Sequence, residues 1–402
     1  MQESCDASGM RICVVYDCLF PYTVGGGERW YRNAAERLAR EGHEVAYLTL
    51  RQWEKGTRPE LEEDVRVIAV GPRMALYTDS GRRRILPPLV FGLGVFAHLL
   101  RHGRSYDVVD TCAFPYFSLL AAALLRPLMG FELVVDWFEV WSAAYWREYL
   151  GRAGGAMGML VQRLCALVPQ RAYCFSELHA ARLREEGLRG PVTVLRGLLD
   201  ASVQPRAPEP AEPVVLFAGR LIPEKQVTLA VAAIALARER IEGLRAVIIG
   251  EGPERAALEA AIADHGLGEA VSAQGFAEAA RLDEEMGRAM CMLVTSRREG
   301  YGLVVVEAAA HGTPSVVVAG EDNAATELIA EGVNGTLAAS ADPQAVADAI
   351  VRVHTAGFAM RSSTAAWFAE NATALSLESS LATVLAGYGG TGASAPGESP
   401  NL

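Results

Sequence analysis

Residues 291–311 read CMLVTSRREGYGLVVVEAAAH, an apolar run followed by a polar loop with two glycines and a second apolar stretch. Residues 291–295 are typical of a buried strand, and residues 304–311 favour a helix. A strand that enters a helix through a short loop is one unit of a parallel sheet. Because ligands bind beyond the carboxyl ends of such strands, we expect Glu299 in the loop to lie at a ligand site.

The same alternation of strands and helices runs along nearly the whole chain. Strands are predicted at residues 12–16, 45–50, 65–70, 108–110, 133–136, 172–175 and 192–195, and again at 214–218, 246–250, 271–274, 291–295 and 315–318. Helices are predicted between them, among others at residues 28–41, 177–186, 226–238, 253–265 and 304–311. This pattern indicates an α/β protein built on parallel sheets.

A segment with four prolines, residues 201–213 (ASVQPRAPEPAEP), separates the two series of strands and is typical of a linker. The two series predict two Rossmann-like domains of similar size. In chain order we predict a disordered extension, an N-terminal Rossmann-like domain, a linker, a C-terminal Rossmann-like domain, a helical segment and a disordered tail, at residues 1–9, 10–200, 201–213, 214–355, 356–386 and 387–402.

Composition narrows the class of protein. The 402 residues are 51% hydrophobic and 21% charged, enough to form sizeable cores, and the net charge is −11. An acidic chain is a poor candidate for a general nucleic-acid binder, which needs a basic surface, so no nucleic-acid partner is expected. The seven cysteines include no C-x-x-C pair, which predicts reduced packing residues in a cytoplasmic protein.

Residues 85–100 (ILPPLVFGLGVFAHLL) form the most apolar helical stretch. The stretch is shorter than the about 18 residues that a spanning helix needs, and it contains two prolines. Arginines flank it at Arg82, Arg83 and Arg84 and at Arg101 and Arg104. A buried helix with arginines reaching to water is the favoured interpretation. Peripheral contact with a membrane surface is the alternative.

Two further segments contain groups suited to an anionic ligand. Gly25, Gly26 and Gly27 precede a predicted helix, whose N-terminal N–H groups and dipole attract anions. Arg220 and Lys225 follow the predicted strand 214–218 and together suit a diphosphate. Taken singly, either segment is equally compatible with a structural turn or with solvated charges.

The segment around Glu299 is the most informative. The backbone amides of Gly300, Tyr301, Gly302 and Leu303 would form the start of a helix and could contact phosphate or sugar oxygens. Glu307 follows about a turn and a half later, where a carboxylate can accept two hydrogen bonds from a ribose diol.

These motifs together resemble glycosyltransferase family 4, the retaining nucleotide-sugar-dependent enzymes of GT-B fold. The resemblance extends from about residue 10 to 350 and rests on GGGERW, LFAGRLIPEK, VIIGEGPERAAL, the two glutamates Glu299 and Glu307 with seven residues between them, and HGTPSVVVAGEDNAATELIAEGVNGTL. It implies two facing Rossmann-like domains with an interdomain cleft. It also implies transfer of a sugar from a nucleotide diphosphate sugar to a small-molecule, lipid or glycan acceptor, with no metal and no cofactor.

The resemblance also implies roles for single residues. The Gly25–Gly27 loop, Arg220 and Lys225 would hold the diphosphate, Glu299 would face the donor sugar, and Glu307 would bind the ribose. Glu299, Arg220 and Lys225 are therefore the expected catalytic groups. The amides of residues 299–303 would contact sugar hydroxyls and phosphate.

The chain departs from the family pattern at two positions. Phe138 stands where many relatives have a histidine that reaches the donor sugar or its phosphate, and Arg196 stands where relatives usually have an asparagine. Glu139 and Arg196 are candidates to hold the sugar in place of the histidine. Because of Phe138, a catalytically silent nucleotide-sugar-binding protein remains an alternative, and a nucleotide-sugar epimerase of the same fold is another.

Weaker candidates complete the survey. His98 and His102 are spaced like a helical metal pair, but no carboxylate or cysteine partner for them is evident, so no metal site is expected. Aromatic residues cluster after the predicted strand 133–136 and could be either an acceptor platform or core. They are Trp137, Trp141, Tyr145 and Trp146.

Overall fold

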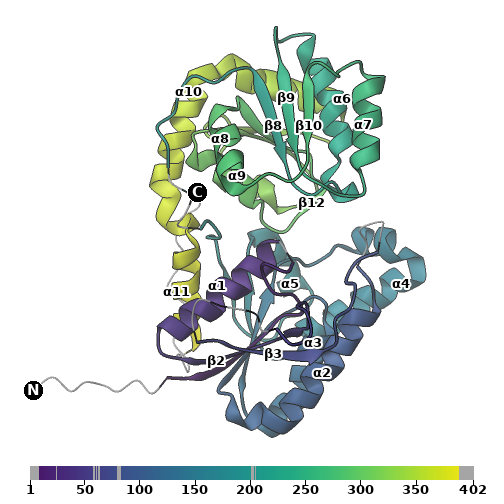
Figure 1. The fold of residues 1–402 in the computed structure, drawn as a ribbon, viewed down its shortest axis with the longest axis vertical. Coiled ribbons are helices and arrows are strands. Elements are labelled where there is room, and N and C mark those ends of the chain that lie inside the picture. Colours follow the sequence, from purple (N-terminus) through teal and green to yellow (C-terminus); the bar gives the residue numbers. More distant parts are fainter. Residues whose placement is uncertain are drawn as a thin grey trace, which may run out of the picture.

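The computed structural model describes residues 9–388 apart from 24, 58, 60, 62–63, 79–82, 201–202 and 204. Two α/β domains lie one above the other in Figure 1, and each contains a parallel sheet. Residues 1–8 of the predicted extension (1–9) and residues 389–402 of the predicted tail (387–402) lie outside the described residues.

The first domain has a seven-stranded parallel sheet in the order β3-β2-β1-β4-β5-β6-β7. The strands are β1 (Arg11–Val15), β2 (Glu44–Leu50), β3 (Arg66–Gly71), β4 (Val108–Cys112), β5 (Glu132–Trp137), β6 (Arg171–Cys174) and β7 (Val192–Val194). The helices are α1 (Gly26–Arg40), α2 (Leu86–His102), α3 (Phe117–Met129), α4 (Ala143–Ala166) and α5 (Glu177–Glu185), with a 3₁₀ turn η1 (Gly103–Ser105).

The second domain has a six-stranded parallel sheet in the order β10-β9-β8-β11-β13-β15. Its strands are β8 (Val214–Ala218), β9 (Arg245–Ile249), β10 (Val271–Gln274), β11 (Cys291–Val294), β13 (Ser315–Val318) and β15 (Gly335–Ala338), and a separate pair joins β12 (Arg298–Glu299) to β14 (Asp322–Asn323). The helices are α6 (Val227–Arg238), α7 (Arg255–Asp264), α8 (Ala279–Arg288) and α9 (Leu303–Ala310), with η2 (Pro223–Lys225) and η3 (Ala324–Leu328).

The central strands are apolar because helices cover both faces of each sheet. Every residue of β4, β11 and β13 is buried. All twelve predicted strands are present, with ends that differ by no more than two residues. The prediction of two parallel-sheet domains is therefore confirmed.

The strand β15 was not predicted, because GTLA is short and begins with glycine. A Cβ atom on Gly335 would lie 2.1 Å from the carbonyl oxygen of Ser315, so glycine allows the close approach of the neighbouring strand β13. This requirement comes from the partner strand and leaves no local pattern.

The chain crosses between the domains twice. The second crossing is α10 (Pro343–Leu375), which bends at Gly357, where φ is 55°, and leads into α11 (Leu377–Tyr388) on the first domain (Figure 1). Leu199 joins this segment through backbone hydrogen bonds to Leu375 and Leu377 of 3.0 and 2.8 Å. The end of the described chain is thus part of the first domain.

Two buried carboxyl groups lie beneath α11. Tyr388 donates a hydrogen bond to Asp110 on β4, and Trp30 donates one of 2.6 Å to Asp136 on β5. Burial raises the pKa of both acids, and each has one oxygen with no hydrogen-bond partner among the described residues. Their proximity disfavours ionisation of both together.

The six described cysteines are buried and form no disulfide. Within the described residues, no helix combines the length and the apolar character needed to cross a bilayer. Helix α2, which contains the apolar stretch 85–100, is packed against the sheet along Phe91, Val95 and Leu99 and leaves its opposite side exposed.

Candidate functional site

Glu299 lies at the junction of the two domains, after the carboxyl end of β11. Its carboxylate forms an ion pair with Lys225 and accepts a hydrogen bond of 2.6 Å from the Ser296 hydroxyl. Burial raises the pKa of Glu299, but the Lys225 ammonium and the Ser296 hydroxyl outweigh it and hold the pKa below its usual value. Glu299 is therefore a mostly buried, ionised carboxylate, with 13% of its side chain exposed.

Lys225 reaches Glu299 from the neighbouring strand unit. It ends the turn η2 that follows β8, and the Thr295 hydroxyl donates a hydrogen bond of 2.8 Å to its carbonyl oxygen. Because β8 and β11 are adjacent and parallel, their loops meet at one edge of the sheet. The structure thus brings together Lys225 and Glu299, which are 74 residues apart in the chain.

Arg220 also follows β8, and its side chain is exposed. It has no ion pair or hydrogen bond from its side chain among the described residues. Its charge lowers the pKa of Glu28 on the first domain, against the larger raising effect of burial. Arg220 is therefore a free cation that faces the glycine loop of the other domain.

The glycine loop itself begins α1. Glu28 folds back over the first turn, since a Cβ atom on Gly25 would lie 2.4 Å from a carboxylate oxygen of Glu28. A Cβ atom on Gly27 would lie 2.7 Å from the Tyr16 hydroxyl, so this position is crowded, whereas Gly26 is open. The helix start predicted to bind an anion therefore lies next to a carboxylate in the unliganded protein.

This carboxylate predicts a pH dependence of donor binding. Burial raises the pKa of Glu28, so lowering the pH toward that pKa protonates it and removes its repulsion of a diphosphate. The dissociation constant of a nucleotide diphosphate sugar should fall as the pH is lowered. In Glu28→Gln it should be roughly fivefold lower at neutral pH and nearly independent of pH. Calorimetry from pH 5 to 8 would test this, and a steeper pH dependence in the variant would contradict it.

The residues after Glu299 lie close to the first domain. A Cβ atom on Gly300 would lie 2.7 Å from the carbonyl oxygen of Phe138. Gly302 caps α9 with φ of 102°, and Leu303 begins the helix. The Tyr301 side chain is buried and donates a hydrogen bond of 2.5 Å to the carbonyl oxygen of Arg196, so it fastens a first-domain loop and leaves only its backbone for a ligand.

Glu307 is on α9, about one turn after the helix begins at Leu303. Its carboxylate has no hydrogen-bond partner among the described residues. Burial raises the pKa of Glu307, and Arg29 on α1 of the first domain opposes the shift. A half-buried acceptor without a protein partner is suited to a diol.

Phe138 packs as an aromatic residue. Its ring stacks on Phe175 with centroids 4.5 Å apart and an interplanar angle of 4°, and it meets Tyr31 edge-on at 6.2 Å. It also lies beside the glycine loop, 3.6 Å from the position of a Cβ atom on Gly27. The side chain that replaces the expected histidine thus faces the same space as that loop.

We expect Phe138→His to fold, because an imidazole fits the space of a half-buried phenyl ring and can keep the stacking on Phe175. Turnover should rise or extend to further donors, since the imidazole adds a hydrogen-bond donor beside the glycine loop. Thermal unfolding and donor turnover of both proteins would be measured together. An unfolded or inactive variant beside an active wild type would show that the pocket depends on the phenyl ring.

Glu139 and Arg196 are both engaged elsewhere. Glu139 forms an ion pair with Arg298 and accepts a hydrogen bond of 2.7 Å from Trp141. Arg196 is half-exposed, with Glu177 3.7 Å away. The nearby aromatic residues Trp137, Trp141, Tyr145 and Trp146 are each at most 9% exposed. They are core, so the alternative of an exposed acceptor platform is wrong.

Sequence reasoning missed the residues that hold the domains together. Arg298 packs over the rings of Trp141 and Tyr145, and burial lowers its pKa to about 10. Asp322 binds Arg182 at 2.6 Å, and Glu327 accepts hydrogen bonds of 2.8 and 2.7 Å from the first amides of α5. Nothing local marks these contacts, because each needs a partner from the other domain.

His98 and His102 lie next to each other on α2. The two rings are 4.8 Å apart, and His98 is hydrogen-bonded to Tyr106 at 2.8 Å. Among the described residues, no group of three histidine, cysteine or acidic side chains is placed to bind a metal.

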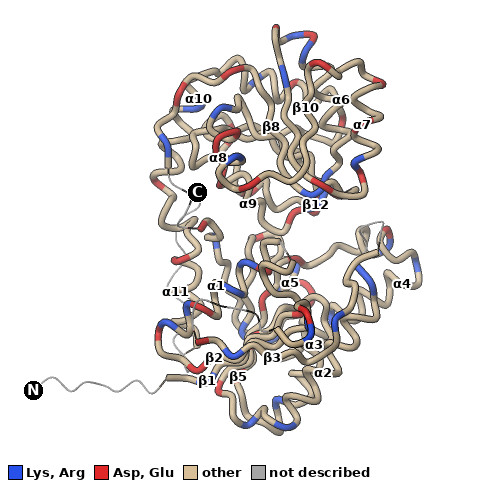
Figure 2. The backbone as a smooth tube through the Cα atoms, viewed as in Figure 1, with Lys and Arg blue, Asp and Glu red and all other residues tan. Residues whose placement is uncertain are grey.

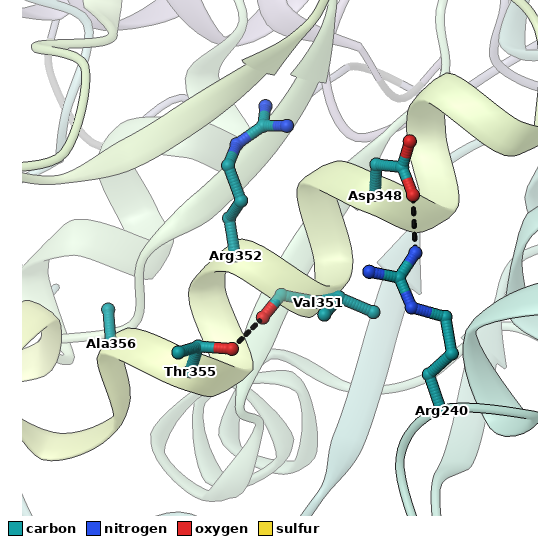
Figure 3. A pocket seen from close by; sticks show the side chains of 6 residues that line it. All are labelled: Arg240, Asp348, Val351, Arg352, Thr355 and Ala356. Carbon is teal, nitrogen blue, oxygen red and sulfur yellow. Dashed lines mark hydrogen bonds and ion pairs between the residues drawn. The ribbon is translucent and has the colours of Figure 1, made fainter.

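Two hollows in the protein surface lie on the second domain, away from Glu299. One, of about 490 Å³, is lined by Arg240, Asp348, Val351, Arg352, Thr355 and Ala356 (Figure 3). The other, of about 530 Å³, is lined by residues of α6, the segment just after α7 and Pro343 at the start of α10. The Arg240–Asp348 pair in the first is close to half-exposed, as surface ion pairs are, and neither hollow contains a predicted site residue.

Comparison with protein families accounts for most of the chain. Residues 24–202 match the family described as Glycosyltransferase Family 4, and residues 201–373 match Glycosyl transferases group 1. The boundary between the two matches falls where the sequence predicts the linker. The two matches together extend from the glycine loop into α10.

Several individual proteins are also similar to this chain over most of its length. The glycogen synthase of Mycobacterium tuberculosis is 28% identical over 363 residues, which are 85% of each chain. Among solved structures, sucrose-phosphate synthase from Thermosynechococcus elongatus has a TM-score of 0.74 at 19% identity, covering 94% of this chain and 98% of that one. Anabaena Alr3699/HepE in complex with UDP-glucose has a TM-score of 0.69 at 18% identity, covering 94% and 100%.

Proposed function

Because the chain belongs to the glycosyltransferases of the family 4 type and has the GT-B fold, we propose that it is a retaining hexosyltransferase. It takes a sugar from a nucleotide diphosphate sugar and transfers it to an acceptor hydroxyl. The observation that carries this proposal is the set of charges at the domain junction, where Lys225 holds an ionised Glu299 and Arg220 has no partner among the described residues.

Each group has a step in the proposed reaction. The bond between the sugar carbon and the diphosphate breaks as the acceptor oxygen bonds to the same face of that carbon, and the acceptor proton passes to a diphosphate oxygen. Positive charge grows on the sugar and negative charge on the diphosphate. Arg220 and Lys225 stabilise the diphosphate, and the ammonium has three N–H donors, so it can bind Glu299 and phosphate together.

The donor and acceptor are proposed by class. The structural relative from Anabaena was solved with UDP-glucose, which supports a nucleoside diphosphate hexose as donor. The acceptor is a small molecule, a lipid or a glycan, and a membrane contact is part of the proposal for a lipid. No metal or cofactor is assigned a step.

Incubation of the purified protein with a panel of nucleotide sugars tests the function. Slow hydrolysis of one donor, which releases nucleoside diphosphate and free sugar, is the expected result without an acceptor. An isomerised sugar nucleotide would indicate the epimerase. Binding without turnover would favour a silent binder, which the phenyl ring at Phe138 makes the second candidate.

Glu307→Ala should separate binding from chemistry. We expect nucleoside diphosphate to bind about tenfold to a hundredfold more weakly, because two charge-assisted hydrogen bonds to the ribose are lost. Turnover at saturating donor should change little. Calorimetry with the free nucleotide and steady-state kinetics measure the two effects, and Glu259→Ala on exposed α7 is the control. Unchanged nucleotide affinity would remove Glu307 from the ribose site.

A further inference from the structure

Exposed large apolar side chains are concentrated on one part of the first domain. Of fifteen such residues among those described, eleven lie between Ile85 and Leu164, on or next to α2, α3 and α4. We name the exposed surface of these helices the α2–α3–α4 face, and define it by the side chains of Leu86, Leu93, Leu100, Leu124, Leu128 and Leu160.

The three helices form one layer. Helices α2, α3 and α4 connect β3 to β4, β4 to β5 and β5 to β6, and each connection moves in the same direction across the sheet. Right-handed crossovers therefore place all three helices on one side of the sheet. Gly92 of α2 lies against Phe117 at the start of α3. Tyr116, the N-cap of α3, donates a hydrogen bond of 3.1 Å to Gln162 of α4. Figure 1 shows the three helices along the lower right of the molecule.

The apolar side chains follow helical spacing and are well exposed. Leu86, Leu93 and Leu100 are seven residues apart, which is close to two turns, so they form one stripe. Leu93 and Leu124 are each 70% exposed. Exposure at this level over adjacent helices is unusual in a monomeric protein and marks a contact surface.

The charge of these helices is opposite to that of the chain. The protein has a net charge of −11, yet α2, α3 and α4 contain five arginines and one acidic residue, Glu148. Glu148 is bound to Arg297 of the second domain. Two more cations lie beside these helices: Arg84, two residues before α2, and Arg104, in η1 after α2. None of these seven arginines has an acidic partner among the described residues, and α4 shows more blue than red in Figure 2.

We infer that the α2–α3–α4 face docks on an anionic lipid bilayer. Leucines that enter the headgroup boundary and arginines that meet lipid phosphates are the two components of peripheral membrane binding. A symmetric dimer through this face is disfavoured, because it would place arginines opposite one another. Docking would bring the protein to a lipid acceptor, and this part of the inference rests on the proposed function.

The face leads toward the domain junction. The backbone N–H of Arg83, just before α2, donates a hydrogen bond of 3.3 Å to the Tyr149 hydroxyl on α4. In the same part of α4, Tyr145 donates one of 3.1 Å to Glu224 of the second domain. Helices that follow parallel strands begin at the carboxyl edge of the sheet. A docked protein would therefore bring the site near the membrane, where a lipid acceptor lies.

Sedimentation with vesicles tests the docking without donor or acceptor. Wild-type protein should bind vesicles that contain phosphatidylglycerol, bind phosphatidylcholine vesicles only weakly, and be released by salt. Arg101→Gln/Arg152→Gln/Arg163→Gln should lower partitioning roughly a hundredfold. Leu93→Gln/Leu124→Gln should lower it at least about tenfold. Phe358→Gln/Arg281→Gln on the second domain is the matched control and should bind like wild type.

Three results would overturn the inference. They are no binding to phosphatidylglycerol vesicles at low salt, an equal loss in the control, or wild-type binding by the arginine triple variant. A dimer in light scattering that the two leucine substitutions abolish would assign the face to a second copy instead. Donor hydrolysis is measured in solution, so a protein that hydrolyses donor and ignores vesicles disproves the docking alone.

Discussion

Glu299→Ala should lower turnover by two to three orders of magnitude while nucleoside diphosphate still binds within about threefold of wild type. Glu299 is mostly buried and ionised beside Lys225, at the edge of the sheet where the sugar would lie. A fixed charge near a developing positive charge accounts for a loss of about this size. The expected effect is on turnover because the interaction strengthens as the sugar becomes cationic.

Two further variants test whether the hydrogen bond and the ion pair of Glu299 contribute to its effect on turnover. Ser296→Ala removes one hydrogen bond to Glu299 and keeps the ion pair, so it should lose only a few-fold in turnover. Lys225→Met leaves Glu299 buried without its cation, which should raise the pKa of Glu299 and move the acid limb of the rate profile to higher pH. Near-normal turnover of Glu299→Ala, with the protein folded, would exclude a role for this carboxylate at the sugar.

Arg220→Ala should lower turnover about a hundredfold to a thousandfold and leave the thermal unfolding midpoint unchanged. The side chain is exposed, and its charge acts on Glu28 and Tyr77 across the junction, so its loss removes little packing. A guanidinium that binds a departing diphosphate accounts for the loss of rate. Rates with saturating donor and thermal unfolding would be measured on the same preparations.

Arg220→Lys is the matched variant, because it keeps the charge and loses the planar fork. We expect it to recover about tenfold of the lost rate. Arg281→Ala, an exposed arginine on α8, is the control and should resemble wild type. Wild-type turnover and nucleotide affinity in Arg220→Ala would show that the diphosphate is bound elsewhere.

The fold followed from the sequence because parallel strands and their helices each leave a local pattern. Residues 291–295 and 315–318 are continuous apolar runs of the length of a strand, and both are strands. β12 and β14 were missed because each has two residues and depends on pairing Arg298 with Asp322 across a loop.

The candidate site was predictable as a set of residues and less so as an arrangement. The spacing after β8 and β11 predicts that Lys225 and Glu299 lie near one ligand, but it does not predict that they pair with each other. The orientation of Glu28 over Gly25 and the use of Glu139 by Arg298 depend on side-chain geometry between distant segments. Such choices are made by tertiary contacts that a linear pattern does not contain.

The return of α11 to the first domain affects the order in which the protein is made. A ribosome finishes residues 9–200 long before it reaches Tyr388, which covers Asp110 and completes that core. Domains usually fold in order of synthesis, N-terminal first. Here the second domain can close while the first still exposes two acids and the side of α1 that α11 covers. The domain that begins translation is therefore the last to be completed, and a chain that stops short of Tyr388 leaves the nascent N-terminal half open to chaperones and proteases.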